Sequence, residues 1–336
     1  MSKKYSIVGI GNAIVDLLCF VEDKFLQEHN LTKGGMFLVD ENNAAKFSSL
    51  EYNKISSGGS VANSIASLAM FDCKTAFIGK VGNDKSGEIF FEDLKKMGSN
   101  FYCKNKAKSG STAKSFVLIT PDGERTMCTY LGCASQIESE IDEDVIKDSK
   151  VLYIEGYLWD EEKTILAIRN AITIAKDNNV KVAFSLSDAF CVTRHKADFR
   201  GLAENIDIMF ANETEISVLI GEDFSDNNYK KVVDYINHFN SNLIIAMTVQ
   251  EKGSVIFEGT KNIHQVPTTK IDKVVDSTGA GDAFAAGFLY GIDSGLNLEQ
   301  SAEFGNVLAG RIILQVGARL ISKQDFIIPN NFGPKK

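Results

Sequence analysis

The sequence predicts an α/β protein with a doubly wound, mainly parallel sheet, helices on both faces and a small β-sheet lid. Apolar, β-branched segments alternate with amphipathic segments over most of the 336 residues, as in parallel sheets that helices cover on both faces. Residues 17–57 and 103–134 interrupt this alternation with short β-prone runs. Near the C-terminus, residues 274–291 join a β-branched segment, a TGAG turn and a helix of small and aromatic residues.

The elements follow from hydrophobic periodicity and from their end signals. In chain order the sequence predicts strand 5–10, helix 60–71, strand 75–79, helix 86–98, strand 151–155, helix 161–179, strands 180–186 and 206–210, helix 213–220, strand 242–249, a hairpin of 253–259 with 263–267, and helices 281–292 and 301–316. We expect residues 1–16, 58–102 and 135–336 to form the α/β domain, and residues 17–57 and 103–134 to form the lid. In the lid, the Asp122-Gly123 pair predicts a hairpin turn.

Composition narrows the class of protein. The net charge of −8 argues against a general nucleic-acid binder, because phosphate backbones need a basic face. The six cysteines are scattered and form no CxxC pair, so neither a zinc site nor a disulfide framework is indicated. No signal peptide and no apolar run of about 20 residues is evident, so we expect a cytoplasmic protein with no membrane partner.

The TGAG turn is followed by a single acid, Asp282. Asp is a favoured helix N-cap, so the segment could be only a capped turn. The same geometry could serve chemistry, because free amides at the start of a helix bind anions. In that interpretation Gly279, Ala280 and Gly281 would form an anion hole, with Asp282 as a base for a hydroxyl that attacks a phosphate. The turn alone leaves both interpretations open.

The segment GIGNAIVD superficially resembles a dinucleotide fingerprint. The position of its third glycine holds Ile14, which argues against a Rossmann dehydrogenase. Asn12 and Asp16 remain as polar residues at the carboxyl end of a strand, where open α/β sheets bind ligands. They could equally be turn-forming residues.

Glycines also precede the first long helix. Gly58 and Gly59 lie where the lid joins the α/β domain, and Asn63 lies in the first turn of the helix that follows. These glycines could be a plain linker, or a hinge that closes the lid while Asn63 binds substrate hydroxyls.

Two further polar sites have equally simple alternatives. Asn212 and Glu215 are one helical turn apart and could be a helix cap, or could hold water around Mg²⁺ near nucleotide phosphates. Arg125, beside the lid hairpin, could be a solvated side chain or a contact for phosphate or hydroxyl groups. The sequence contains no Walker A motif, so the segment TGAGD must carry any phosphate chemistry.

Two segments together resemble signatures of a known family. DSTGAGDAFAAGF is similar to the C-terminal signature of the ribokinase-like (PfkB) carbohydrate and nucleoside kinases, and GGSVANSIASLAMFDCKTAFIGKVGNDKSGEIF is similar to the N-terminal one. The resemblance covers essentially the whole chain and implies a doubly wound α/β domain with a β lid. It also implies transfer of the γ-phosphate of MgATP to an alcohol.

The resemblance assigns roles to residues position by position. It implies that Asp282 is the catalytic base, with the TGAG amides as the anion hole. An acceptor site would be lined by Asn12, Asp16, Gly58, Gly59, Asn63 and Arg125. The nucleotide side would comprise Asn212, Thr248, Gly253 and Asn306, with Glu215 holding Mg²⁺ through water and a K⁺ ion beside Asp276.

Within the family, the segments GGSVANS, IDIMFANETE and FSLSDAF are most similar to those of adenosine kinases. The segment EGYLWD places Tyr157 or Leu158 where those enzymes have an aromatic side chain against the purine. We therefore expect phosphorylation of the 5′-OH of adenosine by a monomer or homodimer. The alternatives are a sugar kinase that acts on fructose or ribose, and a non-catalytic sensor of nucleosides or sugars.

Overall fold

The computed structural model describes residues 3–103, 110–222, 229–320 and 332. These residues form two sheets. The larger one has nine strands in the order β14-β13-β12-β11-β10-β9-β1-β5-β6. Neighbours are parallel from β6 to β12, whereas β13 and β14 are antiparallel. Its strands are β1 (Tyr5–Ile10), β5 (Thr75–Ile78), β6 (Asn100–Tyr102), β9 (Ser149–Glu155), β10 (Lys181–Ser185), β11 (Ile208–Asn212), β12 (Ile244–Thr248), β13 (Ser254–Glu258) and β14 (Asn262–Val266).

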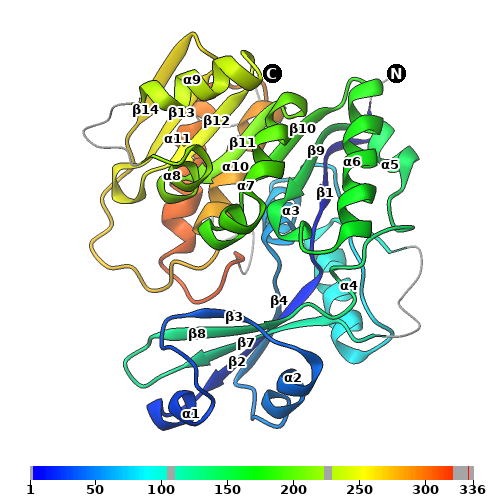
Figure 1. Ribbon diagram of the computed structural model, residues 1–336, viewed down its shortest axis with the longest axis vertical. Coiled ribbons are helices and arrows are strands. Elements are labelled where there is room, and N and C mark those ends of the chain that lie inside the picture. The colour runs from blue at the N-terminus through cyan, green and yellow to red at the C-terminus, as the bar shows by residue number, and fades with distance from the viewer. Residues whose placement is uncertain (1–2, 104–109, 223–228, 321–331, 333–336) are drawn as a thin grey trace.

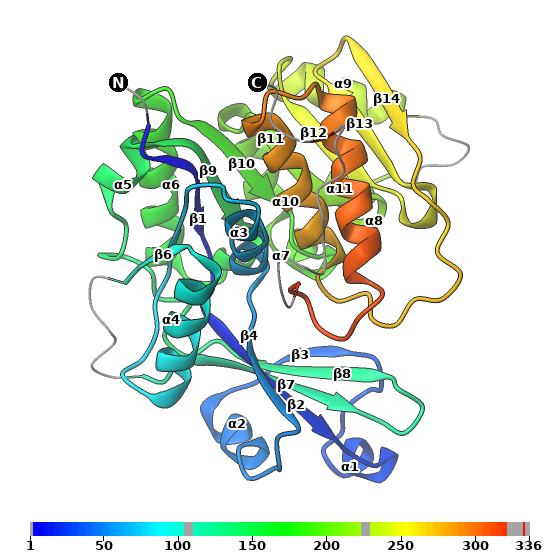
Figure 2. The same ribbon diagram turned by 180° about the vertical axis from the view of Figure 1, so that it is seen from behind.

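Helices cover both faces of this sheet, which confirms the doubly wound α/β fold. One face carries α5 (Glu143–Lys147), α6 (Glu162–Asp177), α7 (Ala189–Leu202), α8 (Glu213–Ile220) and α9 (Lys230–Phe239), as Figure 1 shows. The view from behind shows α3 (Ser60–Met70), α4 (Lys85–Met97), α10 (Ala280–Asp293) and α11 (Leu298–Ile312) on the other (Figure 2). Short 3₁₀ turns lie at Gly156–Leu158, Ala203–Asn205 and Gln250–Lys252.

The smaller sheet lies beyond the carboxyl end of β1, below the large sheet in Figure 1. We call it the lid sheet; its strand order is β3-β8-β7-β2-β4. It consists of β2 (Ile14–Phe20), β3 (Met36–Leu38), β4 (Lys54–Ser57), β7 (Ala113–Ile119) and β8 (Arg125–Tyr130), with α1 (Asp23–Glu28) and α2 (Glu41–Phe47) beside it. The segments 17–57 and 103–134 carry these elements, except that β2 begins at Ile14.

Most predicted elements occur within one to three residues of their expected ends. β7 and β8 form the expected antiparallel hairpin, in which Gly123 has a φ of 85°. Helix α7 was not expected, and it contains a kink at His195 that breaks its periodicity. Helix α9 was also not expected. The lid likewise contains two short helices where the sequence indicated only β-prone runs.

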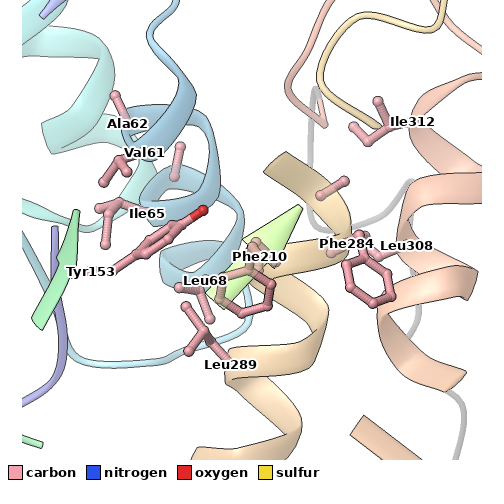
Figure 3. Close-up of a cluster of buried hydrophobic side chains, with 14 of the residues drawn as sticks. Val61, Ala62, Ile65, Leu68, Tyr153, Phe210, Phe284, Leu289, Leu308 and Ile312 are labelled. Atoms are coloured by element: carbon pink, nitrogen blue, oxygen red, sulfur yellow. The ribbon is translucent and has the colours of Figure 1, made fainter. Parts of the chain in front are cut away.

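The small residues of α10 allow it to pack closely between its neighbours. A Cβ added to Gly287 would lie 2.7 Å from the Cα of Gly305 in α11. Figure 3 shows Leu68 of α3 and Leu289 of α10 beside Phe210 of β11. Each such leucine is almost fully buried, which stabilises the fold by about 1.5–3 kcal/mol. This packing sets the first turn of α10 against the first turn of α3.

Candidate active site

Asp282 lies in the first turn of α10 but does not cap the helix. The N-cap residue is Gly279, whose φ of 80° favours glycine. The carboxylate of Asp282 instead accepts hydrogen bonds from α3: Ser60 Oγ donates to Oδ1 at 2.6 Å, and Asn63 Nδ2 donates to Oδ2 at 2.9 Å. Ser64 Oγ donates to the Asp282 carbonyl oxygen at 2.8 Å. Three side chains of α3 therefore hold the candidate base in one orientation.

The charge of Asp282 is sensitive to its surroundings. Burial raises the pKa of its carboxyl to about 6, although the hydrogen bonds from Ser60 and Asn63 and the charge of Arg319 oppose the rise. Burial also raises the pKa of Asp16 to about 7, and the nearby Asp282 contributes to that rise. At neutral pH Asp282 is mainly ionised and can accept a proton.

The start of α10 has the features of an anion site. The first amide N–H groups of any helix lack intrahelical acceptors, and no side chain caps those of α10 in the described part of the chain. The Ala280 amide donates to the Ser277 carbonyl oxygen at 3.2 Å. Ala280 and Gly281 line a cavity of about 980 Å³. A Cβ added to Gly281 would meet no heavy atom within 4 Å. The backbone is therefore open to a ligand at this point, and the positive end of the helix dipole favours an anion there.

The same cavity collects the residues that we expect on the nucleotide side. It extends across the carboxyl ends of β10, β11 and β12. Its walls include Asp282 together with Asn212, Glu215, Thr248, Gly253 and Asn306. These residues come from four separate segments of the chain, and the fold brings them to one edge of the sheet, where open α/β sheets bind ligands.

Asn212 and Glu215 form a capping box at the start of α8. Asn212 Oδ1 accepts from the Glu215 amide at 2.9 Å, and Glu215 Oε2 accepts from the Asn212 amide at 3.0 Å. Asn212 Nδ2 also donates to Glu215 Oε1 at 2.6 Å. Burial raises the pKa of Glu215 to about 7. Since each carboxylate oxygen has a further lone pair, this donor set is compatible with water around Mg²⁺.

Thr248, Gly253 and Asn306 build the far wall of the cavity. Gly253 has a φ of 102°, and a Cβ there would lie 2.7 Å from the backbone nitrogen of Thr268. Asn306 is buried, and its Nδ2 donates to the Val266 carbonyl oxygen at 2.9 Å. Asn306 thereby joins α11 to the end of β14.

The expected acceptor residues do not line this cavity and lie at the junction with the lid sheet. Gly59 is the N-cap of α3 with a φ of 89°. Gly58 lies so close to the Asp16 carboxylate that a Cβ would overlap its oxygens. Asn12 is buried, its Nδ2 donates to the Tyr157 carbonyl oxygen at 3.3 Å, and its Oδ1 has no partner among the described residues.

Tyr157 and Leu158 differ in how deeply their side chains are buried. Leu158 is 1% exposed and belongs to the hydrophobic core around α6 and α7. Tyr157 is partly buried and packs against that core. Neither side chain lines the cavity described above.

Arg125 and Asp276 were expected to bind different groups, but they contact one another. Arg125 Nη1 lies 2.7 Å from Asp276 Oδ2, and both side chains are largely buried. Asp276 also accepts from the amides of Thr278 at 3.1 Å and Gly317 at 2.7 Å. The ion pair connects β8 of the lid sheet to the turn before α10.

Two charged residues at the site were not predicted from the sequence. Glu155, at the end of β9, is fully buried and accepts from the amides of Asn12 at 2.8 Å and Val61 at 2.9 Å. Arg319 contacts Asn63 and Gly58 from the segment after α11. Glu155 begins the segment EGYLWD, in which only Tyr157 and Leu158 were singled out, and Arg319 lies in none of the quoted motifs.

Glu155 is expected to contribute to stability. In Glu155→Gln, one amide side-chain oxygen replaces two acceptors, so one buried N–H group loses its partner. We expect the free energy of unfolding to fall by about 1–3 kcal/mol, measured by urea denaturation. Glu161→Gln, an exposed acid six residues further on, is the control, and equal stability of the two variants would contradict this role.

Comparison with known proteins agrees with these features. Residues 38–325 match the model of the pfkB family carbohydrate kinases. A probable sugar kinase from Rhizobium etli is 34% identical, with a TM-score of 0.86 over 96% of this chain and 97% of that one. The adenosine kinase from Sinorhizobium meliloti is 36% identical, with a TM-score of 0.85 over 96% and 98%. A 5-dehydro-2-deoxygluconokinase from Bacillus licheniformis is 27% identical over 93% of this chain and 90% of its own length.

In this family the substrates are ATP, generally with Mg²⁺, and a small-molecule alcohol. Among the described residues no helix is long and apolar enough to cross a membrane, and no group of three or more His, Cys, Asp or Glu side chains could hold a metal. The chain thus belongs to the pfkB family of carbohydrate kinases and is a phosphotransferase with an alcohol acceptor.

Proposed function

We propose that the protein transfers the γ-phosphate of MgATP to the 5′-OH of adenosine, with Asp282 as the base. The observation that carries this proposal is the orientation of the Asp282 carboxylate by Ser60 and Asn63, one residue from the open backbone at Gly281. A hydroxyl group beside Asp282 would donate its proton to the carboxylate as it attacks the phosphorus atom. The first amides of α10 would stabilise the charge on the transferred group.

The nucleotide would occupy the cavity of about 980 Å³. When bound, Mg²⁺ neutralises phosphate charge during transfer. Glu215 would hold it through water, while Asn212, Thr248, Gly253 and Asn306 would line the nucleotide. We also propose that a K⁺ ion binds beside Asp276, whose carboxylate pairs with Arg125. A loss of turnover when a bulky organic cation replaces K⁺ would support it.

The acceptor would lie between Asp282 and the lid sheet, where Asn12, Asp16 and Asn63 could bind ribose hydroxyls. Gly58 and Gly59 would allow the lid sheet to close and exclude water. We propose residues 17–57 and 103–134 as this lid. The identity of 36% with an adenosine kinase supports a nucleoside acceptor.

A sugar acceptor is the second candidate. Leu158 is buried in the core rather than available to a purine, and relatives at 24–28% identity include several 5-dehydro-2-deoxygluconokinases. The test is ADP formation with MgATP and adenosine, inosine, ribose, fructose or 5-dehydro-2-deoxygluconate. Preferential turnover of adenosine would support the proposal. Preference for a sugar would refute adenosine as the substrate while leaving the kinase mechanism intact.

The pH dependence of kcat/KM should report the ionisation of Asp282. Because Asp282 must be ionised to accept a proton and its pKa is about 6, kcat/KM should fall about tenfold per pH unit well below pH 6. Asp16, with a pKa of about 7, would broaden this acid limb. Initial rates between pH 4.5 and 9 measure it, with refolding at pH 7.5 as the control for denaturation. A flat profile down to pH 5 would contradict Asp282 as the base.

A further inference from the structure

The guanidinium of Arg319 contacts Asn63, one of the residues that hold the candidate base. Nε donates to Asn63 Oδ1 at 2.9 Å, and Nη2 donates to the Gly58 carbonyl oxygen at 3.1 Å. Nη1 is buried without an acceptor among the described residues. One side chain thus contacts the residue that holds Asp282 and the glycine pair before α3.

Arg319 and the Asp282 carboxylate favour the same orientation of the Asn63 amide between them. The oxygen and nitrogen ends of an asparagine amide have nearly the same shape, so packing alone does not select one. A guanidinium carries only donors, and it therefore requires the oxygen of Asn63 on its own side. The amide nitrogen must then face Asp282, where it donates to Oδ2 at 2.9 Å.

The positive charge of Arg319 also favours the ionised form of Asp282. The charge of Asp282 raises the pKa of four nearby acidic groups, Asp16, Tyr153, Glu155 and Glu215. Arg319 lowers the pKa of Asp282 against burial. Burial in turn lowers the pKa of Arg319 to about 10, so the guanidinium stays charged at neutral pH.

The contact with Gly58 adds a link to the lid sheet. Gly58 follows β4 of that sheet, and its amide donates to the Ile14 carbonyl oxygen of β2 at 2.8 Å. Two residues before Arg319, the amide of Gly317 donates to Asp276, which also pairs with Arg125 of β8. The segment 317–319 therefore contacts Gly58, which follows β4, and Asp276, which pairs with Arg125 of β8.

We propose that Arg319 is a positioning residue for phosphoryl transfer, which orients the Asn63 amide toward Asp282 and ties this pair to the lid connection at Gly58. The proposal rests on the proposed kinase function. Arg319 would act through Asn63 rather than on the reacting atoms. It would matter for turnover more than for binding of ATP, because Arg319 does not line the nucleotide cavity.

The experiment compares Arg319→Gln and Arg319→Lys with wild type and with Arg169→Gln, which removes an exposed arginine on α6. Since a misplacement of about 1 Å can cost about 10²-fold, we expect Arg319→Gln to lose about 10- to 100-fold in kcat. Its KM for ATP should stay within about threefold, and its acid limb should move to higher pH. Arg319→Lys keeps the charge but has a single donor nitrogen in place of three, so it should recover part of the loss and most of the pH shift.

Two outcomes would overturn the proposal: Arg319→Gln with wild-type kcat and acid limb, or a loss expressed only in the KM for ATP. Circular dichroism checks that each variant is folded. If wild type phosphorylates no acceptor, the proposed function fails separately. The inference is then tested by NMR titration of the Asp282 carboxyl carbon in ¹³C-Asp-labelled protein. The Asp282 signal is identified by its absence in Asp282→Asn. The pKa of Asp282 should be higher in Arg319→Gln than in wild type, and equal values would refute the role.

Discussion

Asp282→Asn is expected to lower kcat by about 10²–10⁴-fold, with little effect on stability. The amide has the shape of the carboxylate but cannot accept a proton from the attacking hydroxyl. Its oxygen can still accept from Asn63, and its nitrogen can donate to Ser60 after that hydroxyl rotates. The geometry around α3 and α10 is therefore retained while the proposed chemistry is lost.

The stability of this variant gives a second readout. The pKa of Asp282 is about 6 in the folded chain, above its ordinary value of 3.8. Ionisation of Asp282 therefore disfavours folding, and this cost is fully present above pH 6 and absent below about pH 4. At pH 8 Asp282→Asn should be at least as stable as wild type in urea denaturation.

Asp293→Asn is the matched control, because it changes an aspartate at the far end of the same helix. It should keep kcat within about threefold, as for a change distant from the reacting atoms. Steady-state ADP formation with saturating MgATP measures both variants. An Asp282→Asn enzyme with wild-type turnover would exclude Asp282 as the base and with it the proposed mechanism.

Gly281→Ala should lower kcat/KM by about 10²-fold without damage to the fold. The new methyl group meets no protein atom within 4 Å, but it projects into the cavity where we place the transferred phosphate. Displacement of that phosphate by about 1 Å is enough for such a loss. Alanine is also the better helix former by about 0.5–1 kcal/mol, so the melting temperature should stay equal or rise.

Gly201→Ala separates the effect of the added methyl group on helix stability from its effect on activity. Gly201 is a helical glycine of α7 whose added Cβ also meets no heavy atom within 4 Å, but it does not line the cavity. It should gain or keep stability and retain full activity. Wild-type activity in Gly281→Ala would mean that the transferred group does not approach the backbone at the start of α10.

Local features of the fold could be predicted from the sequence because they depend on neighbours in the chain. Alternation of apolar strands with amphipathic helices was sufficient for the α/β class, and the Asp122-Gly123 pair indicated the lid hairpin. Helix α7 was missed because the kink at His195 interrupts its period. The short helices of the lid were missed because one or two turns carry little periodic signal.

In the candidate site, too, local patterns predicted some features correctly and misplaced another. The TGAGD segment drew attention to Asp282 and Gly281, and the resemblance of two motifs indicated the family that the comparisons confirm. The capping box of Asn212 and Glu215 is likewise a local arrangement of neighbouring residues. For Leu158, in contrast, the sequence suggested a place beside the acceptor, whereas the fold places it in the core.

By itself, the sequence determined the α/β class, the glycine turn before α10 and the acid beside it, because adjacent residues set backbone conformation and helix ends. Only the tertiary structure decided what surrounds that acid. Asn63 and Asp282 are 219 residues apart, and Asn63 and Arg319 are 256 apart. Such contacts depend on the packing of α3 against α10 and on the path of the chain after α11, and no local pattern encodes either of these.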